Sequence, residues 1–104
     1  MPKRYRLQYL PIFWDDLLQA LLYIRDVLEN PLAAQRLADQ VEQGILEHLE
    51  NPTNAAIYKT TRSRRLPYYW FPVGNYMVLY VVDNDVMEVR RFAYGSRDLT
   101  KIVV

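Results

Sequence analysis

The chain has 104 residues, of which 51% are apolar and 24% are charged, and its formal net charge is +1. This length predicts a single domain that spans residues 1–104 and is built around one hydrophobic core. There is no cysteine, which excludes disulfides, zinc–thiolate sites and a catalytic thiol. The longest apolar run, residues 77–82, is far shorter than the about 20 residues that cross a bilayer. Because the N-terminus also lacks the apolar core of a signal peptide, we expect a cytoplasmic protein.

The charges are unevenly distributed along the chain. Residues 7–55 carry eight acidic and two basic side chains, a balance of −6. Residues 56–104 carry eight basic and four acidic side chains, a balance of +4, and residues 1–6 add three positive charges. A basic C-terminal half beside an acidic middle predicts a surface for a polyanion or an acidic protein segment, and an ordinary mixed surface is the alternative.

The N-terminal part predicts a strand followed by a helix. Residues 5–10 alternate apolar and polar side chains, which is the period of a half-buried strand. Pro11 ends this strand. Apolar side chains then recur at spacings of three and four, which predicts a helix over residues 12–29. We expect Asp15 and Asp16 in its first turn, where negative charge favours the positive end of the helix dipole.

The dipeptide Asn30-Pro31 predicts a break between two helices. Asparagine can cap the N-terminus of the next helix, and proline is tolerated at its first position. The second helix carries a continuous apolar stripe and ends near Glu50. Its His48, the only histidine of the chain, is expected to be a solvated helix residue. The two helices therefore form a hairpin.

The C-terminal half predicts a small antiparallel sheet. Residues 53–65 are polar and are expected to be irregular and exposed. Three β-rich runs follow at residues 68–71, 76–82 and 86–94, and the short spacers between them predict an antiparallel meander. The expected fold is thus α+β, with the order β-α-α-β-β-β and an N-terminal strand and helix hairpin packed on the sheet.

This order of elements, together with residues at the joints, resembles the RelE/ParE superfamily of toxins. The motifs that carry the resemblance span nearly the whole chain: Asp16-Leu17, Tyr23-Ile24, Asn30-Pro31 with Ala34 and Leu37, Leu49 before Asn51-Pro52, Gly74-Asn75-Tyr76 leading into Tyr80, Val89-Arg90-Arg91-Phe92, and Tyr94-Gly95-Ser96-Arg97-Asp98. The resemblance implies the toxin of a type II toxin–antitoxin pair. Its partner would be an antitoxin whose acidic, amphipathic segment covers the basic face of the toxin.

Members of this superfamily divide by their target. RelE-like toxins cut mRNA in the ribosomal A site without a metal, whereas ParE-like toxins poison DNA gyrase. Neither activity implies a cofactor. Because a fold hosts more than one function, the resemblance alone does not choose between the two targets.

Two residues are candidates for catalysis if the target is mRNA. Metal-free RNA cleavage needs a group that activates the ribose 2′-hydroxyl, cations for the phosphate and a proton donor. By the resemblance, Arg97 stands at the position of a phosphate-stabilising arginine, and Tyr94 resembles the C-terminal tyrosine of the YoeB-like branch. The alternatives are a surface ion pair of Arg97 with Asp98 or Asp85, and an aromatic side chain that closes the core for Tyr94.

Five basic residues are candidates for binding a phosphate backbone. They are Lys59, Arg62, Arg64, Arg65 and Arg91. For the first four, a solvated charge run is the alternative. Arg90 and Arg91 are expected on opposite faces of a strand, so only one of them can join a patch with Arg97. Arg91 is the candidate, although strand alternation places it with Val89 and Ala93 in a partly buried row. A buried arginine there would demand a carboxylate partner.

Several positions depart from the RelE-like pattern. Met77 stands where RelE-like enzymes carry an arginine, Tyr68 and Trp70 stand where RelE carries lysines, and the histidine of the YoeB-like branch would fall at Ala93. Strand alternation places Tyr68 and Trp70 on one face and Tyr69 and Phe71 on the other. At most one of these pairs is therefore available for stacking on bases.

The sequence thus predicts growth arrest by a toxin and leaves its target open. Retention of Arg97 and Tyr94 slightly favours translation-dependent mRNA cleavage. The missing cations favour the alternative, ParE-like inhibition of DNA gyrase. A second alternative is a catalytically inactive partner that only binds the antitoxin.

Overall fold

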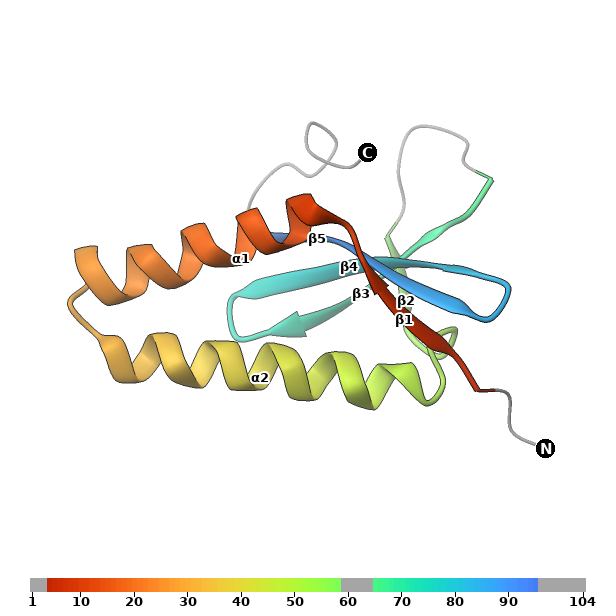
Figure 1. Ribbon diagram of the computed structural model, residues 1–104, viewed down its shortest axis with the longest axis horizontal. Helices are drawn as coiled ribbons and strands as arrows, with labels where there is room; N and C mark the ends of the chain where they lie inside the picture. Colours follow the sequence, from red (N-terminus) through yellow and green to blue (C-terminus); the bar gives the residue numbers. More distant parts are fainter. Residues whose placement is uncertain (1–3, 59–64, 96–104) are drawn as a thin grey trace.

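The fold is a pair of helices packed on one face of a five-stranded mixed sheet with the order β1-β5-β4-β3-β2 (Figure 1). The computed structural model describes residues 4–58 and 65–95. The strands are β1 (Arg6–Tyr9), β2 (Ala56–Tyr58), β3 (Tyr68–Val73), β4 (Tyr76–Asp83) and β5 (Val86–Tyr94). The α+β class and the antiparallel β3-β4-β5 meander are confirmed.

Two features of the sheet differ from the expectation. β1 pairs with β5 in parallel, from Arg6 opposite Val86 to Tyr9 opposite Val89, so the sheet is mixed rather than antiparallel. The segment 53–65, expected to be irregular, contains the edge strand β2, which pairs antiparallel with β3. β1 and β5 are far apart in the sequence, and β2 has only three residues. A local sequence pattern therefore specifies neither pairing.

The helical layer consists of α1 (Pro11–Leu22), which continues into a π-helical turn, η1 (Tyr23–Val27), and α2 (Pro31–Leu49). Pro11 is the first residue of α1, where its missing N–H costs no hydrogen bond. Asp15 and Asp16 consequently lie beyond the first turn, contrary to the expectation, and the dipole argument does not explain them. No helix in the described ranges is long and apolar enough to cross a membrane.

The break between the helices forms as the sequence predicts. The Asn30 side chain accepts a hydrogen bond from the Ala33 N–H at 3.1 Å, and Pro31 begins α2. Glu29, just before the cap, adopts a left-handed backbone with φ of 52° and reverses the chain. The two helices therefore run side by side in opposite directions (Figure 1).

The main core lies between the helices and the sheet. Its fully buried side chains include Phe13 of α1, Ile45 of α2 and Tyr80 of β4. The Tyr80 hydroxyl donates a hydrogen bond of 2.6 Å to the Pro52 carbonyl and so ties the segment after α2 to the sheet. Burial raises the pKa of Tyr80 well above its usual value, with the neighbouring Tyr69 as a second cause.

His48 is part of this packing rather than a solvated residue. Its ring stacks on Phe71 with centroids 4.0 Å apart and planes 9° from parallel, and its Nδ1 lies 2.8 Å from the Gly44 carbonyl oxygen. A Cβ at Gly44 would come within 2.7 Å of the Phe71 ring. Glycine at this position therefore lets β3 approach α2 closely enough for the stack to form.

The opposite face of the sheet, here called the outer face, carries a second apolar cluster. It contains Tyr68, Met77, Leu79, Val81 and Ala93, with Tyr58, Leu66 and Trp70 packed around them. Tyr69 and Phe71 face the helices instead. The predicted division of the four successive aromatic residues between the two faces is thereby confirmed.

Candidate functional site

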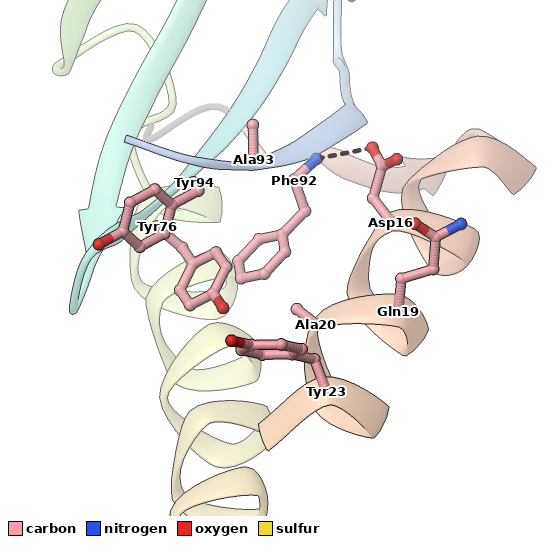
Figure 2. Close-up of a pocket in the computed structure, with 8 residues that line it drawn as sticks. All are labelled: Asp16, Gln19, Ala20, Tyr23, Tyr76, Phe92, Ala93 and Tyr94. Atoms are coloured by element: carbon pink, nitrogen blue, oxygen red, sulfur yellow. Dashed lines mark hydrogen bonds between the residues drawn. The ribbon is translucent and has the colours of Figure 1, made fainter. Parts of the chain in front are cut away.

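A carboxylate from α1 accepts a backbone hydrogen bond at the exposed edge of β5. β1 makes its last contact where the Leu10 N–H donates to the Val89 carbonyl at 2.9 Å, so β1 does not flank β5 beyond that point. There Asp16 accepts a hydrogen bond of 3.1 Å from the Phe92 N–H (Figure 2). The carboxylate thus satisfies a backbone donor of β5 that β1 does not reach.

The same carboxylate holds Arg91. The arginine donates from Nε to Asp16 Oδ2 at 2.8 Å and from Nη2 to Oδ1 at 3.1 Å, a two-point contact between side chains that are only 11% and 16% exposed. Asp16 is therefore the carboxylate that a buried arginine at this position demands. The candidate phosphate ligand Arg91 is largely buried in an ion pair and does not project from the surface.

β5 contains a β-bulge at Arg90, directly before Arg91. Leu79 lies opposite Arg91 and Tyr80 lies opposite Val89, so Arg90 is the extra residue. Arg90 donates to Glu88 at 2.8 Å, and its guanidinium lies 5.8 Å from the centre of the Tyr68 ring. The simple alternation expected for this strand is interrupted here, and the two arginines serve different partners.

Tyr94 lies at the end of β5 on the side of the sheet that faces the helices. Tyr94 is 48% exposed, and its ring meets Tyr76 edge-on with centroids 5.4 Å apart. Tyr76 in turn stacks on Phe92 of the main core. Met77 and Ala93, the positions where cationic or imidazole groups would be expected in relatives that cut RNA, belong to the outer face. The Tyr94 ring therefore packs on the opposite side of the sheet from the Met77 side chain, although Ala93 also lines the edge of the groove described below.

Residues 65–95, which contain β3, β4 and β5, have no excess of positive charge. Between residues 65 and 95 there are three arginines and three acidic residues, and Arg65, Arg90 and Arg91 each contact a carboxylate. The Arg65 pair with Asp83 is long, 3.5 Å, and exposed. Four predicted site residues fall outside the described residues: Lys59, Arg62, Arg64 and Arg97.

An open groove of about 570 Å³ lies beside Asp16, between α1, η1 and the ends of β4 and β5. We call it the tyrosine groove, and it is lined by Asp16, Gln19, Ala20, Tyr23, Tyr76, Phe92, Ala93 and Tyr94 (Figure 2). Burial raises the pKa of Tyr76, and the nearby phenols of Tyr94 and Tyr23 add to this effect. The sequence alone does not predict a role for Tyr23 or Tyr76, because no local pattern shows that their side chains converge.

A second groove of about 550 Å³, here called the helix groove, lies between α1 and α2. Its lining is apolar except for Glu42 and comprises Tyr9, Phe13, Trp14, Leu17, Leu18, Leu21, Ala38, Val41, Glu42, Ile45 and Leu46. Trp14, Leu18 and Leu46 are each at least half exposed, at 50%, 54% and 50%. Contiguous exposed apolar side chains of this kind are typical of a surface that another protein covers.

Within residues 4–58 and 65–95, no three side chains of histidine, cysteine, aspartate or glutamate lie close enough together to hold a metal ion. The helix groove offers mainly apolar surface, whereas the tyrosine groove combines aromatic rings with a carboxylate, an amide and phenolic hydroxyls. Grooves of this kind can receive a ligand or part of a partner protein.

The profile of a family described as "ParE toxin of type II toxin-antitoxin system, parDE" matches residues 5–99. The chain belongs to this family. The match confirms the resemblance to the RelE/ParE superfamily and identifies the chain as a toxin of a type II toxin–antitoxin system. No curated protein matches this ParE-family chain significantly.

Two solved structures share the fold of this ParE-family chain. A structure described as the chromosomal ParDE toxin–antitoxin system from P. aeruginosa is 13% identical, with a TM-score of 0.64, and the match covers 88% of this chain and 96% of that one. The archaeal RelE–RelB complex from Pyrococcus horikoshii OT3 is 15% identical, with a TM-score of 0.58, and the match covers 91% and 99% of the two chains. At these identities the likeness shows the fold alone.

Proposed function

We propose that this ParE-family toxin arrests growth by inhibiting DNA gyrase. The observation that carries the proposal is the chemistry of the outer face. Tyr68 and Met77, which stand where RelE-like enzymes carry cations, are 1% and 8% exposed and belong to an apolar cluster. The match to the ParE family supports the same choice.

The described residues offer little that would cleave RNA. Stabilising a phosphorane requires cations aimed at the phosphate, and the charged pair on this face, Arg90 with Glu88, is already neutralised. Tyr94 lies on the helix side, away from that pair. An inhibitor of a protein target needs a complementary surface and no catalytic cations. The proposal therefore departs from the slight preference for mRNA cleavage that rested on Arg97 and Tyr94.

The proposed partner is an antitoxin with an amphipathic segment. Its apolar side chains would occupy the helix groove, because an amphipathic helix laid between two helices buries the half-exposed Trp14, Leu18 and Leu46. Asp39, Glu42 and Glu47 surround Leu46 beside the groove, so acidic side chains of the partner would be repelled there. Acidic residues of the antitoxin would therefore pair with the basic C-terminal half of the toxin.

The target is tested by expressing the toxin alone from a tightly controlled promoter and following pulse incorporation of thymidine and of amino acids. We expect DNA synthesis to fall first, and purified toxin to inhibit gyrase supercoiling in vitro. An Arg97→Ala variant and a Tyr94→Phe variant run in parallel. If protein synthesis falls first and Arg97→Ala is harmless, mRNA cleavage replaces the proposal. If neither synthesis falls, only an antitoxin-binding role remains.

The antitoxin site is tested with matched leucine variants. Leu18 in the helix groove and Leu28 outside it are 54% and 55% exposed. We expect Leu18→Asp to weaken the toxin–antitoxin complex at least about tenfold, since it places a charge in a buried apolar contact, while Leu28→Asp leaves affinity within about twofold. Calorimetric titration measures both. Equal effects of the two variants would remove the helix groove from the interface.

A further inference from the structure

The tyrosine groove is not used by the proposed function. It lies at the end of the sheet where β4 begins and β5 ends, whereas the helix groove lies between α1 and α2. Its three phenols come from three elements: Tyr23 from η1, Tyr76 from β4 and Tyr94 from β5. The rings gather on one side of α1, and Asp16 lies further along the same wall (Figure 2).

Packing fixes the central ring and leaves the outer two accessible. Tyr76 stacks on Phe92 at 4.9 Å and 11°, and Tyr94 meets it edge-on at 5.4 Å and 83°. Tyr23 and Tyr94 are 52% and 48% exposed. A ligand can therefore reach two ring surfaces and their hydroxyls without moving the core. Such preorganisation lowers the cost of binding.

The position of Tyr23 depends on a local departure from the α-helix. The Leu28 N–H donates to the Tyr23 carbonyl at 3.1 Å, which closes a five-residue turn instead of a four-residue one. A π-helical turn carries one extra residue and is conformationally unfavourable, and such turns concentrate at functional sites. The turn gives a second, independent reason to assign a role to this end of α1.

We propose that the tyrosine groove binds the cationic side chain of an arginine or lysine presented by a protein partner. Aromatic faces attract a guanidinium or ammonium group, and phenolic oxygens accept its hydrogen bonds. In the flanking helical segment, residues 11–27, Asp26 pairs with Arg25 and Asp16 pairs with Arg91. Asp15 supplies the remaining negative charge of this set, which favours a cation.

A nucleic acid fits the described groove less well than a cationic side chain does. Bases can stack on tyrosine rings, but the phosphate backbone demands cations beside them. Among the described residues that line the groove there is no lysine or arginine, and Asp16 contributes a carboxylate. The nearby Arg91 is held by that carboxylate on two atoms. The lack of a cation among these described lining residues therefore favours a protein ligand over a nucleic acid.

The test is a titration of the full chain, labelled with ¹³C in its tyrosine rings, followed by NMR. The probe is Nα-acetyl-arginine N-methylamide, and the matched control is the citrulline analogue, which has the same shape without the charge. We expect saturable shifts of Tyr23, Tyr76 and Tyr94, and roughly two- to fivefold weaker binding of the citrulline compound. Tyr23→Leu and Tyr94→Leu should each weaken arginine binding by a similar factor.

A control variant and a competitor complete the test. Trp14→Leu removes an exposed aromatic ring from the helix groove and should leave arginine binding unchanged. Equal binding of the citrulline compound, or no saturable shift of the three tyrosines, would overturn the proposal. Tighter competition by a hexauridylate would overturn it in favour of a nucleic acid. Because growth arrest is not measured, failure here is distinguishable from failure of gyrase inhibition.

Discussion

The helix-facing side of the sheet and the outer face are both apolar at their centres, yet they differ in what surrounds that centre. On the helix side, Phe13 of α1 and Tyr80 of β4 are fully buried between the helices and the sheet. Both grooves open from this side. On the outer face, Leu79 and Tyr68 are buried to the same degree beside the Arg90–Glu88 pair. An apolar interior alone therefore does not distinguish a structural face from a functional one. The polar groups at its border do.

The greatest loss of stability is expected when a buried side chain of either apolar cluster is removed. Phe13→Ala should lower the free energy of unfolding by about 3–5 kcal/mol, because it removes a fully buried ring and leaves a cavity. Leu79→Ala should cost about 2–5 kcal/mol if the outer cluster is equally well packed. Urea unfolding measures both. A loss below about 1 kcal/mol for Leu79→Ala would show that the outer cluster is not a true core.

The next effect concerns the edge of β5. Asp16→Ala removes the acceptor of the Phe92 N–H and both contacts with Arg91, and we expect a loss of about 2–3 kcal/mol. Asp15→Ala is the matched control, since Asp15 is an exposed carboxylate on the same helix and should change stability by less than about 0.5 kcal/mol. Thermal unfolding of the two variants decides. Similar losses would contradict a specific role for Asp16.

A smaller loss of stability, which depends on pH, is expected when the Tyr80 hydroxyl is removed. Tyr80→Phe should cost about 1–2 kcal/mol at pH 8, because the Pro52 carbonyl loses its donor. Burial raises the pKa of Tyr80, so the folded state favours the neutral phenol. The associated stability is present below the pKa of an unfolded tyrosine, about 10, and is lost as pH rises above it. The wild type should therefore lose more stability than Tyr80→Phe between pH 9 and pH 11.

The control for this pH dependence is Tyr23→Phe, since Tyr23 is about half exposed. Its stability should follow the wild type at both pH values. An unchanged alkaline slope in Tyr80→Phe would mean that Tyr80 ionises without unfolding the chain. The pKa values of Tyr9 and Tyr76 are also raised by burial, so part of the slope should survive in the variant.

The smallest effect is expected at the charged border of the outer face. Glu88→Gln should cost about 0.5–1 kcal/mol, since both partners of the pair keep about a quarter of their side-chain surface in water. Combining it with Arg90→Gln in a double-mutant cycle isolates the pair. The coupling should weaken in 1 M salt. A coupling above about 3 kcal/mol would show that the pair organises this face.

Local signals in the sequence predicted most of the fold. The Asn30-Pro31 break formed as expected because capping is decided by two adjacent residues. The β3-β4-β5 meander formed because its spacers are short. β2 and the parallel β1–β5 pairing were not predicted, since three residues carry too weak a pattern and a parallel partner can lie anywhere along the chain.

The site was less predictable than the fold. Strand alternation predicted that Arg91 lies in a row with Val89. The bulge opposite Leu79 and Tyr80 breaks that row, and no residue type in the sequence predicts the bulge. Asp16 lies 75 positions from Arg91, so their pairing is visible only in three dimensions. His48 was expected in solvent because the sequence does not reveal that Gly44 opens a place for the Phe71 ring beside it.

The parallel pairing of β1 with β5 also bears on how the toxin is made. Arg6 lies opposite Val86, so the first strand finds its hydrogen-bonding neighbour only after the last strand has been synthesised. At about 5–20 residues per second, that delay amounts to several seconds on the ribosome. The helix hairpin, whose contacts are local, can form well before the sheet is complete. Translation itself would thus postpone the moment at which a nascent chain acquires the complete sheet, and an antitoxin already present has that interval to meet it.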